Sequence, residues 1–144
     1  MIMKKNKNMR ALCKVHPDVG LTLCHRKMVT PGSKDVVIRV LKTGICGTDL
    51  QLYHYTPWAQ DTLQLPRIIG HEFVGEIAAL GDQVSSFSVG DCVTAEAHTF
   101  CGHCEQCQSD RRHYCPSVKG LGIHIDGAMA DYVCIPESNV WPCP

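Results

Sequence analysis

Short runs of apolar and β-branched residues, separated by glycine and proline turns, recur along this chain. The runs at residues 36–41 and 73–80 are typical of strands, and residues 92–97 and 128–135 are expected to be strands as well. Gly75 predicts a bend or bulge within the second run, since glycine inside a strand often marks one. The pattern therefore predicts a mainly β fold, either a barrel or a sandwich.

The segments between these runs carry little helical periodicity. Residues 44–49 predict a short helical turn capped by Thr48 or Asp49, and residues 53–66 predict an exposed loop with prolines near both ends. The glycine-rich stretch at 120–127 lacks the third glycine and the following helix of a dinucleotide-binding fingerprint. A nucleotide site is therefore not expected there.

Composition excludes several classes of function. The 144 residues suit one domain, and 14 Lys and Arg balance 14 Asp and Glu, so a nucleic-acid partner is not expected. No apolar stretch approaches the roughly 20 residues of a membrane span. Residues 1–8 are expected to be a disordered tail rather than a signal peptide, because no apolar segment follows the lysines. These features predict a cytoplasmic protein.

Ten cysteines are many for such a chain. Disulfides are typical of secreted scaffolds, and without a secretory signal a metal site is the preferred interpretation. Four cysteines fall within 15 residues, while the others are dispersed. Of the dispersed ones, Cys92 and Cys134 lie in expected strands and are predicted to belong to the core.

The clustered cysteines are separated by two, two and seven residues, and they are Cys101, Cys104, Cys107 and Cys115. Four thiolates at such spacing complete a tetrahedron with no open position, which predicts a structural zinc site. An iron–sulfur cluster is the main alternative, but its last gap would be three residues, with a second cysteine set. His103 and His113 lie in the same loop and are expected to face solvent.

Cys46, His71 and Glu72 form a second candidate group. Thiolate, imidazole and carboxylate are all zinc ligands, and three protein ligands with a free fourth position are typical of a catalytic site. From spacing alone, the other interpretation stays open: a small buried cysteine and a surface histidine–glutamate pair.

Four motifs in series resemble the zinc-dependent medium-chain alcohol dehydrogenases. They are residues 44–49 (Gly-Ile-Cys-Gly-Thr-Asp), residues 70–75 (Gly-His-Glu-Phe-Val-Gly), residues 89–91 (Val-Gly-Asp) and the cysteine cluster. Within that family, Lys42, Tyr53, Trp58 and Glu96-Ala-His98 are most similar to the threonine dehydrogenase branch, with the polyol dehydrogenases next.

The resemblance implies a GroES-like catalytic domain over residues 9–144, a partly open β-barrel with short helices and a zinc-binding loop. By position it implies a catalytic zinc at Cys46, His71 and Glu72 and a structural zinc at the four clustered cysteines. It also implies that Thr48 takes the substrate proton into a relay and that His98 lines the substrate pocket. The family reaction is oxidation of a small alcohol, with hydride transfer to NAD.

Two departures from the family pattern open a choice of function. Gln51 stands where the family usually has the histidine that ends the proton relay, and glutamine cannot accept a proton at neutral pH. The sequence also ends at Pro144, where the family's Rossmann domain would follow. One hypothesis is a truncated or split catalytic domain, inactive alone, that works with a separate Rossmann-domain chain or self-associates. The alternative is a non-catalytic zinc-binding module for protein or small-molecule binding.

Overall fold

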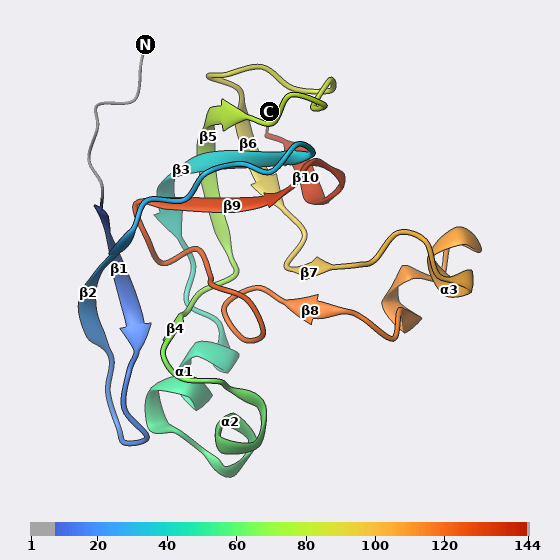
Figure 1. Cartoon of the computed structure of the whole chain (residues 1–144). Helices are drawn as coiled ribbons and strands as arrows, with labels where there is room; N and C mark the ends of the chain where they lie inside the picture. Colours follow the sequence, from blue (N-terminus) through green and yellow to red (C-terminus); the bar gives the residue numbers. More distant parts are fainter. Residues whose placement is uncertain (1–7, 144) are drawn as a thin grey trace.

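The computed structural model describes residues 8–143, and in that range ten strands and short helices surround three apolar clusters. Figure 1 shows the sheets on one side and a lobe containing α3 reaching away from them, attached through β7 and β8. The helical segments are α1 (Gly47–His54), α2 (Pro57–Thr62), α3 (Glu105–Gln108), η1 (Arg112–Tyr114) and η2 (Glu137–Asn139).

The strands of the described range form three sheets. A three-stranded sheet has the order β2-β1-β4, a five-stranded sheet has the order β10-β6-β5-β3-β9, and β7 pairs with β8. The bounds are β1 (Asn8–Lys14), β2 (Thr22–Lys27), β3 (Asp35–Thr43), β4 (Arg67–Ile68), β5 (Phe73–Leu80), β6 (Cys92–Ala95), β7 (His98–Thr99), β8 (Lys119–Gly120), β9 (Tyr132–Pro136) and β10 (Val140–Pro142).

The mainly β prediction, with short helices and a loop that carries the cysteines, is confirmed, and the sheets do not close into a barrel within residues 8–143. An irregularity lies opposite Gly75, but its extra residue belongs to β3 and not to the run 73–80. Gly75 pairs with Val40 of β3, and the next pair along is Lys42 with Val74, so Leu41 is the extra residue of a bulge.

The largest apolar cluster belongs to the five-stranded sheet. Alternate residues of β3, β5 and β9 point into it, among them Ile38, Ile77 and Ile135. This period-two burial is what the β-branched runs predicted. The expected strands at 92–97 and 128–135 are shorter or shifted, since β6 ends at Ala95 and β9 begins at Tyr132.

Two sequence predictions need correction. The segment 53–66 is not an exposed loop, because α1 extends to His54 and α2 follows, with Ala59 and Leu63 buried against Ile69. Pro57 begins α2, a position that proline favours because its missing N–H has no partner to lose. Cys92, the first residue of β6, is exposed rather than part of the core, and the next residue, Val93, is buried instead.

The tail predicted for the N-terminal residues falls mostly outside the described range. Residues 1–7, for which a disordered tail is expected, lie outside it, and Asn8 begins β1. Within residues 8–143, no helix has both the length and the apolar character that crossing a bilayer requires.

Candidate metal centres and substrate cavity

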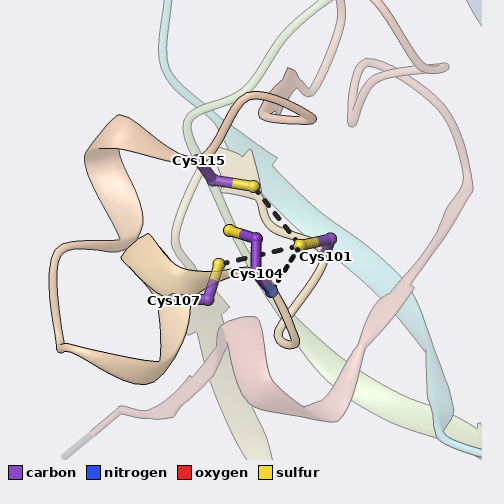
Figure 2. A group of neighbouring side chains, drawn as sticks. All are labelled: Cys101, Cys104, Cys107 and Cys115. Atoms are coloured by element: carbon purple, nitrogen blue, oxygen red, sulfur yellow. Dashed lines mark hydrogen bonds between the residues drawn. The ribbon is translucent and has the colours of Figure 1, made fainter.

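The four clustered cysteines converge in the lobe beyond β7 and β8. Figure 2 shows their sulfur atoms turned toward one another, from the loop before α3, from α3 itself and from the residue after η1. The sulfurs all lie within 4.8 Å of one another, with 3.9 Å between Cys101 and Cys107 and 3.6 Å between Cys101 and Cys115. Four sulfurs at zinc-bonding distance in a tetrahedron would be about 3.8 Å apart, so these spacings fit a zinc ion.

Apart from two of these cysteines, the lobe has no buried side chains within the described range. From Cys101 to Lys119, all described, only Cys107 and Cys115 are buried. A segment so polar lacks the apolar burial that would order it, and a metal bound by its thiolates would supply that order. His103 and His113 are exposed, as expected.

The electrostatic environment differs among these thiols. Backbone N–H groups of His103 and Cys104 lower the pKa of Cys101 to about 6, and the Cys104 N–H lies 3.4 Å from the sulfur. The thiolate, which is the form that binds metal, is therefore favoured at Cys101 near neutral pH. Burial raises the pKa of Cys107 to about 12, an effect that a bound cation would oppose.

All ten cysteines lie in the described range, and each one is a free thiol. The expectation that the cysteines do not form a disulfide framework agrees with this arrangement.

The second group assembles where the start of α1 meets the loop between β4 and β5. Cys46 is the residue before α1, and His71 and Glu72 precede β5. One ligand atom from each of the three lies within 4.8 Å of the others. The Gly44 N–H donates to the Glu72 carbonyl at 2.9 Å, which joins the two segments directly.

Glycine allows this close approach. A Cβ at Gly44 would lie 2.5 Å from a carboxylate oxygen of Glu72, so a larger residue would displace the glutamate. On the other side, Asp49 fixes the loop before α1, because its carboxylate accepts the Cys46 N–H at 2.9 Å.

The donor set fits a zinc ion. Thiolate, imidazole and carboxylate together match a catalytic zinc site with one position left for substrate or water. Within the described residues, Nδ1 of His71 is buried and has no hydrogen-bond partner. A buried nitrogen without a partner destabilises the fold, and a cation coordinated by this ring would offset that cost.

A small cavity of about 90 Å³ adjoins this group. Thr48 and His71 contribute to its wall together with His98, and apolar side chains from Leu121 and Ile123 complete the lining. The sequence-predicted catalytic residues and one predicted ligand thus meet at one cavity, although they are up to 50 positions apart. The thiol of Cys46 lies 3.9 Å from the Thr48 hydroxyl oxygen.

His98 is oriented by two residues that the sequence did not identify as functional. Its Nδ1 lies 3.0 Å from a Glu96 carboxylate oxygen, which also accepts the His98 backbone N–H. The buried Asn139 donates to the carbonyls of His98 at 2.6 Å and Glu96 at 3.2 Å. The Glu96-Ala-His98 spacing is a local signal, whereas Asn139 is 41 positions away and gives none.

Comparison with known proteins agrees with this architecture. Residues 32–144 match the alcohol dehydrogenase GroES-like domain, and the chain therefore belongs to that family. The similar curated relatives include L-threonine 3-dehydrogenases from Saccharopolyspora erythraea, 48% identical over 133 residues, and Stenotrophomonas maltophilia, 45% identical over 136 residues. The matches cover 92% and 94% of this chain but only 39% and 40% of those proteins.

Solved structures show the same fold. A short-chain alcohol dehydrogenase from Escherichia coli in complex with NADH superposes with a TM-score of 0.85 at 32% identity. A putative zinc-binding dehydrogenase from Sinorhizobium meliloti bound to NADP gives 0.84 at 31% identity. Each match covers 95% or more of this chain and 39% of the other. The chain thus spans about two fifths of the proteins it matches.

Proposed function

We propose that this chain forms the zinc-binding catalytic portion of an NAD-dependent alcohol dehydrogenase similar to L-threonine 3-dehydrogenase, which oxidises a secondary alcohol. The observation that carries the proposal is the meeting of Cys46, His71 and Glu72, within 4.8 Å of one another, beside the cavity lined by Thr48 and His98. The names of the relatives support the threonine-like branch.

In this proposal the Cys46, His71 and Glu72 group holds a catalytic zinc and the four lobe cysteines hold a structural one. A zinc ion at the first group would act as a Lewis acid and lower the pKa of a bound substrate hydroxyl. Since the four-thiolate group has no open position, its role is to order the lobe.

Thr48 and His98 are proposed to handle the substrate. The Thr48 hydroxyl, at the cavity wall, would accept the alcohol proton while passing its own toward solvent. His98 keeps Nδ1 on Glu96, which leaves Nε2 to donate to or accept from a polar group of the substrate.

The cofactor of the proposed reaction is NAD. In this proposal, the residues that bind NAD lie outside this sequence. The E. coli and S. meliloti structures contain NADH and NADP respectively. We propose that a nucleotide-binding domain, equivalent to the three fifths of the relatives that this sequence does not match, lies on the same chain or on a separate one. A small-molecule alcohol is then the expected partner, in the cytoplasm.

Metal analysis tests the two zinc sites. The zinc-saturated chain is expected to hold two equivalents of zinc. The variants Cys46→Ser and Cys104→Ser are each expected to hold about one, because each removes a ligand from one of the two groups. Cys24→Ser, outside both groups, serves as the control and is expected to keep two. A single equivalent in the unmodified chain, unchanged in Cys46→Ser, would leave only the structural role and favour a non-catalytic module.

A chimaera tests the catalytic role. The chain is joined to the part of the S. erythraea enzyme that it does not cover, and NADH formation from L-threonine is followed. Activity is expected, and Thr48→Ala is expected to lower kcat by about 100-fold or more. Gln51→His is expected to raise kcat by ~10-fold, since it adds a proton acceptor. Gln83→His, beyond the far end of β5, is the matched control.

The second candidate function, a zinc-binding module without catalysis, is favoured by Gln51 alone. Under that function the zinc-loaded chimaera would fold and bind cofactor but would oxidise no secondary alcohol, with or without Gln51→His.

A further inference from the structure

Two cysteines outside both metal groups face each other across a strand pair. β6 and β10 are antiparallel neighbours, with Pro142 opposite Val93, and Figure 1 shows them side by side near the C-terminal end. One step further along this register, Cys143 lies opposite Cys92, and the Cys143 N–H donates to the Cys92 carbonyl at 2.9 Å.

This arrangement meets the geometric needs of a disulfide. Residues directly opposite in antiparallel strands point their side chains to the same face, with Cα atoms roughly 4.5–5.5 Å apart. Disulfides span Cα separations of about 4.4–6.8 Å. The two thiols also influence each other: burial, and then the neighbouring Cys92, raise the pKa of Cys143.

Accessibility sets this pair apart from the other cysteines. Cys92 is exposed and Cys143 is half-buried. Cys13 also has a cysteine neighbour, Cys24, but it is fully buried, and burial foremost raises its pKa to about 12. An oxidant in solution therefore reaches Cys92 and does not reach Cys13.

We propose that Cys92 and Cys143 are an oxidisable pair that forms a reversible disulfide with a peroxide as oxidant. The Cys92 thiolate attacks one peroxide oxygen, the O–O bond breaks, and a sulfenic acid and one water result. The Cys143 sulfur then displaces the hydroxyl of the sulfenic acid, which leaves as a second water. Two thiols and one hydrogen peroxide thus give one disulfide and two waters, and a small thiol reverses the reaction by exchange.

The bond would fasten the edge of the five-stranded sheet. β10 has three residues and pairs with β6 alone in this sheet, whereas β6 also pairs with β5. A covalent link at Cys143, the residue after β10, would prevent β10 from separating from β6. Because the pair lies outside both metal groups, this inference does not depend on the proposed dehydrogenase function.

Peptide mapping tests the proposal. The zinc-saturated chain is exposed to hydrogen peroxide, free thiols are alkylated, and a protease that cleaves after glutamate is added without reductant. Cleavage after Glu76, Glu96 and Glu137 isolates Cys92 in residues 77–96 and Cys143 in residues 138–144. The expected product is these two peptides joined, two hydrogens lighter than their sum and separated by dithiothreitol.

The other peptides keep the metal sites distinct. Residues 97–105 and 106–137 carry the four lobe cysteines, so their oxidation is measured separately. Recovery of peptides 77–96 and 138–144 unlinked, whether alkylated or over-oxidised, would overturn the proposal. Equal linkage in chain unfolded by guanidinium would also overturn it, because the pairing would then owe nothing to the fold.

Two variants sharpen the result. In Cys143→Ser, Cys92 has no partner, so dimedone is expected to trap its sulfenic acid on residues 77–96. Cys24→Ser is the matched control and is expected to form the link to the same extent as the unmodified chain. Loss of the link in Cys24→Ser would contradict the assignment of partners.

Discussion

Lys14 is fully buried at the end of β1, and its ammonium group reaches three backbone carbonyls. It donates to Asp18, to Gly20 at 3.1 Å and to Tyr53 at 3.2 Å, and it lies 5.0 Å from the centre of the Tyr55 ring. Burial lowers its pKa, because removal from water disfavours the charged form. One side chain thus joins the β1–β2 connection to α1, the helix that follows Cys46.

Replacing this lysine is expected to destabilise the protein. Lys14→Met keeps the length of the side chain but removes the donor, so buried carbonyls lose a partner, at a cost of about 2–4 kcal/mol. Urea unfolding followed by circular dichroism measures the change. Lys27→Met, at an exposed position of β2, is the matched control and is expected to change stability by less than ~0.5 kcal/mol. Similar values for the two variants would contradict this role.

At this scale, the sequence predicted the candidate metal ligands but not the residues that hold the surrounding backbone in place. Closely spaced cysteines and a His-Glu pair after glycine can be recognised in the sequence, because metal ligation restricts residue type and separation. Lys14 and Asn139 act through backbone carbonyls that are distant in sequence, and any residue can supply a carbonyl. No residue pattern therefore identifies them.

The glycine-rich stretch at 120–127 supports the segment before His71. Gly127 donates to the Ile68 carbonyl at 2.8 Å, and Ala128 donates to the Gly70 carbonyl at 2.9 Å. A Cβ at Gly127 would overlap the carbonyl oxygens of Ile69 and Gly70. The stretch is thus a packing surface for the backbone that presents the histidine.

Gly127→Ala is therefore expected to lower the free energy of unfolding by roughly 1–3 kcal/mol, since the backbones must separate to admit a methyl group. The same strain is expected to weaken zinc binding at the His71 group and to spare the lobe. Thermal unfolding and zinc titration measure both effects. Gly47→Ala is the control, because a Cβ there meets no atom within 4 Å.

The lobe formed by residues 101–118 is expected to unfold by itself when the zinc ion proposed for it is removed. Its buried residues are two of the four clustered cysteines, Cys107 and Cys115, while the sheets have their own apolar clusters. Chelation is thus expected to raise the rate of tryptic cleavage after Arg111 and Arg112 by about tenfold or more. Cleavage after Arg39, in the central strand β3, serves as the internal control. Equal acceleration at Arg39 would indicate that the whole fold depends on the metal.

The elements differed in how far the sequence revealed them. β3 and β5 have β-branched or apolar runs; β5 was predicted to the residue, and β3 to within two residues at each end. β1 and β2 were not predicted, because their partly exposed residues include lysine, arginine and cysteine and few β-branched residues. The helices α1 and α2 were not predicted in full, because Pro57 and the aromatic residues around it indicate a loop. The buried face of this region depends on contacts with Leu63 and Ile69.

At the scale of the whole molecule, an open apolar groove of about 460 Å³ lies between the two larger sheets. Its walls include Leu12 of β1, Leu23 of β2 and Val40 and Leu41 of β3, with Ile45 just beyond. Leu23 is 69% exposed and Ile45 is 75% exposed. Apolar side chains grouped on a surface in this way favour association, because contact removes them from water.

The isolated chain is therefore expected to self-associate through this groove at high concentration. Burial of one leucine side chain contributes about 1.5–3 kcal/mol, so Leu23→Glu is expected to raise the dissociation constant by roughly 10- to 100-fold. Sedimentation velocity over a range of concentrations measures it. Val89→Glu is the matched control, since Val89 is 62% exposed but lies outside the groove. An unmodified chain that stays monomeric throughout, or equal weakening by both variants, would show that the groove does not drive association.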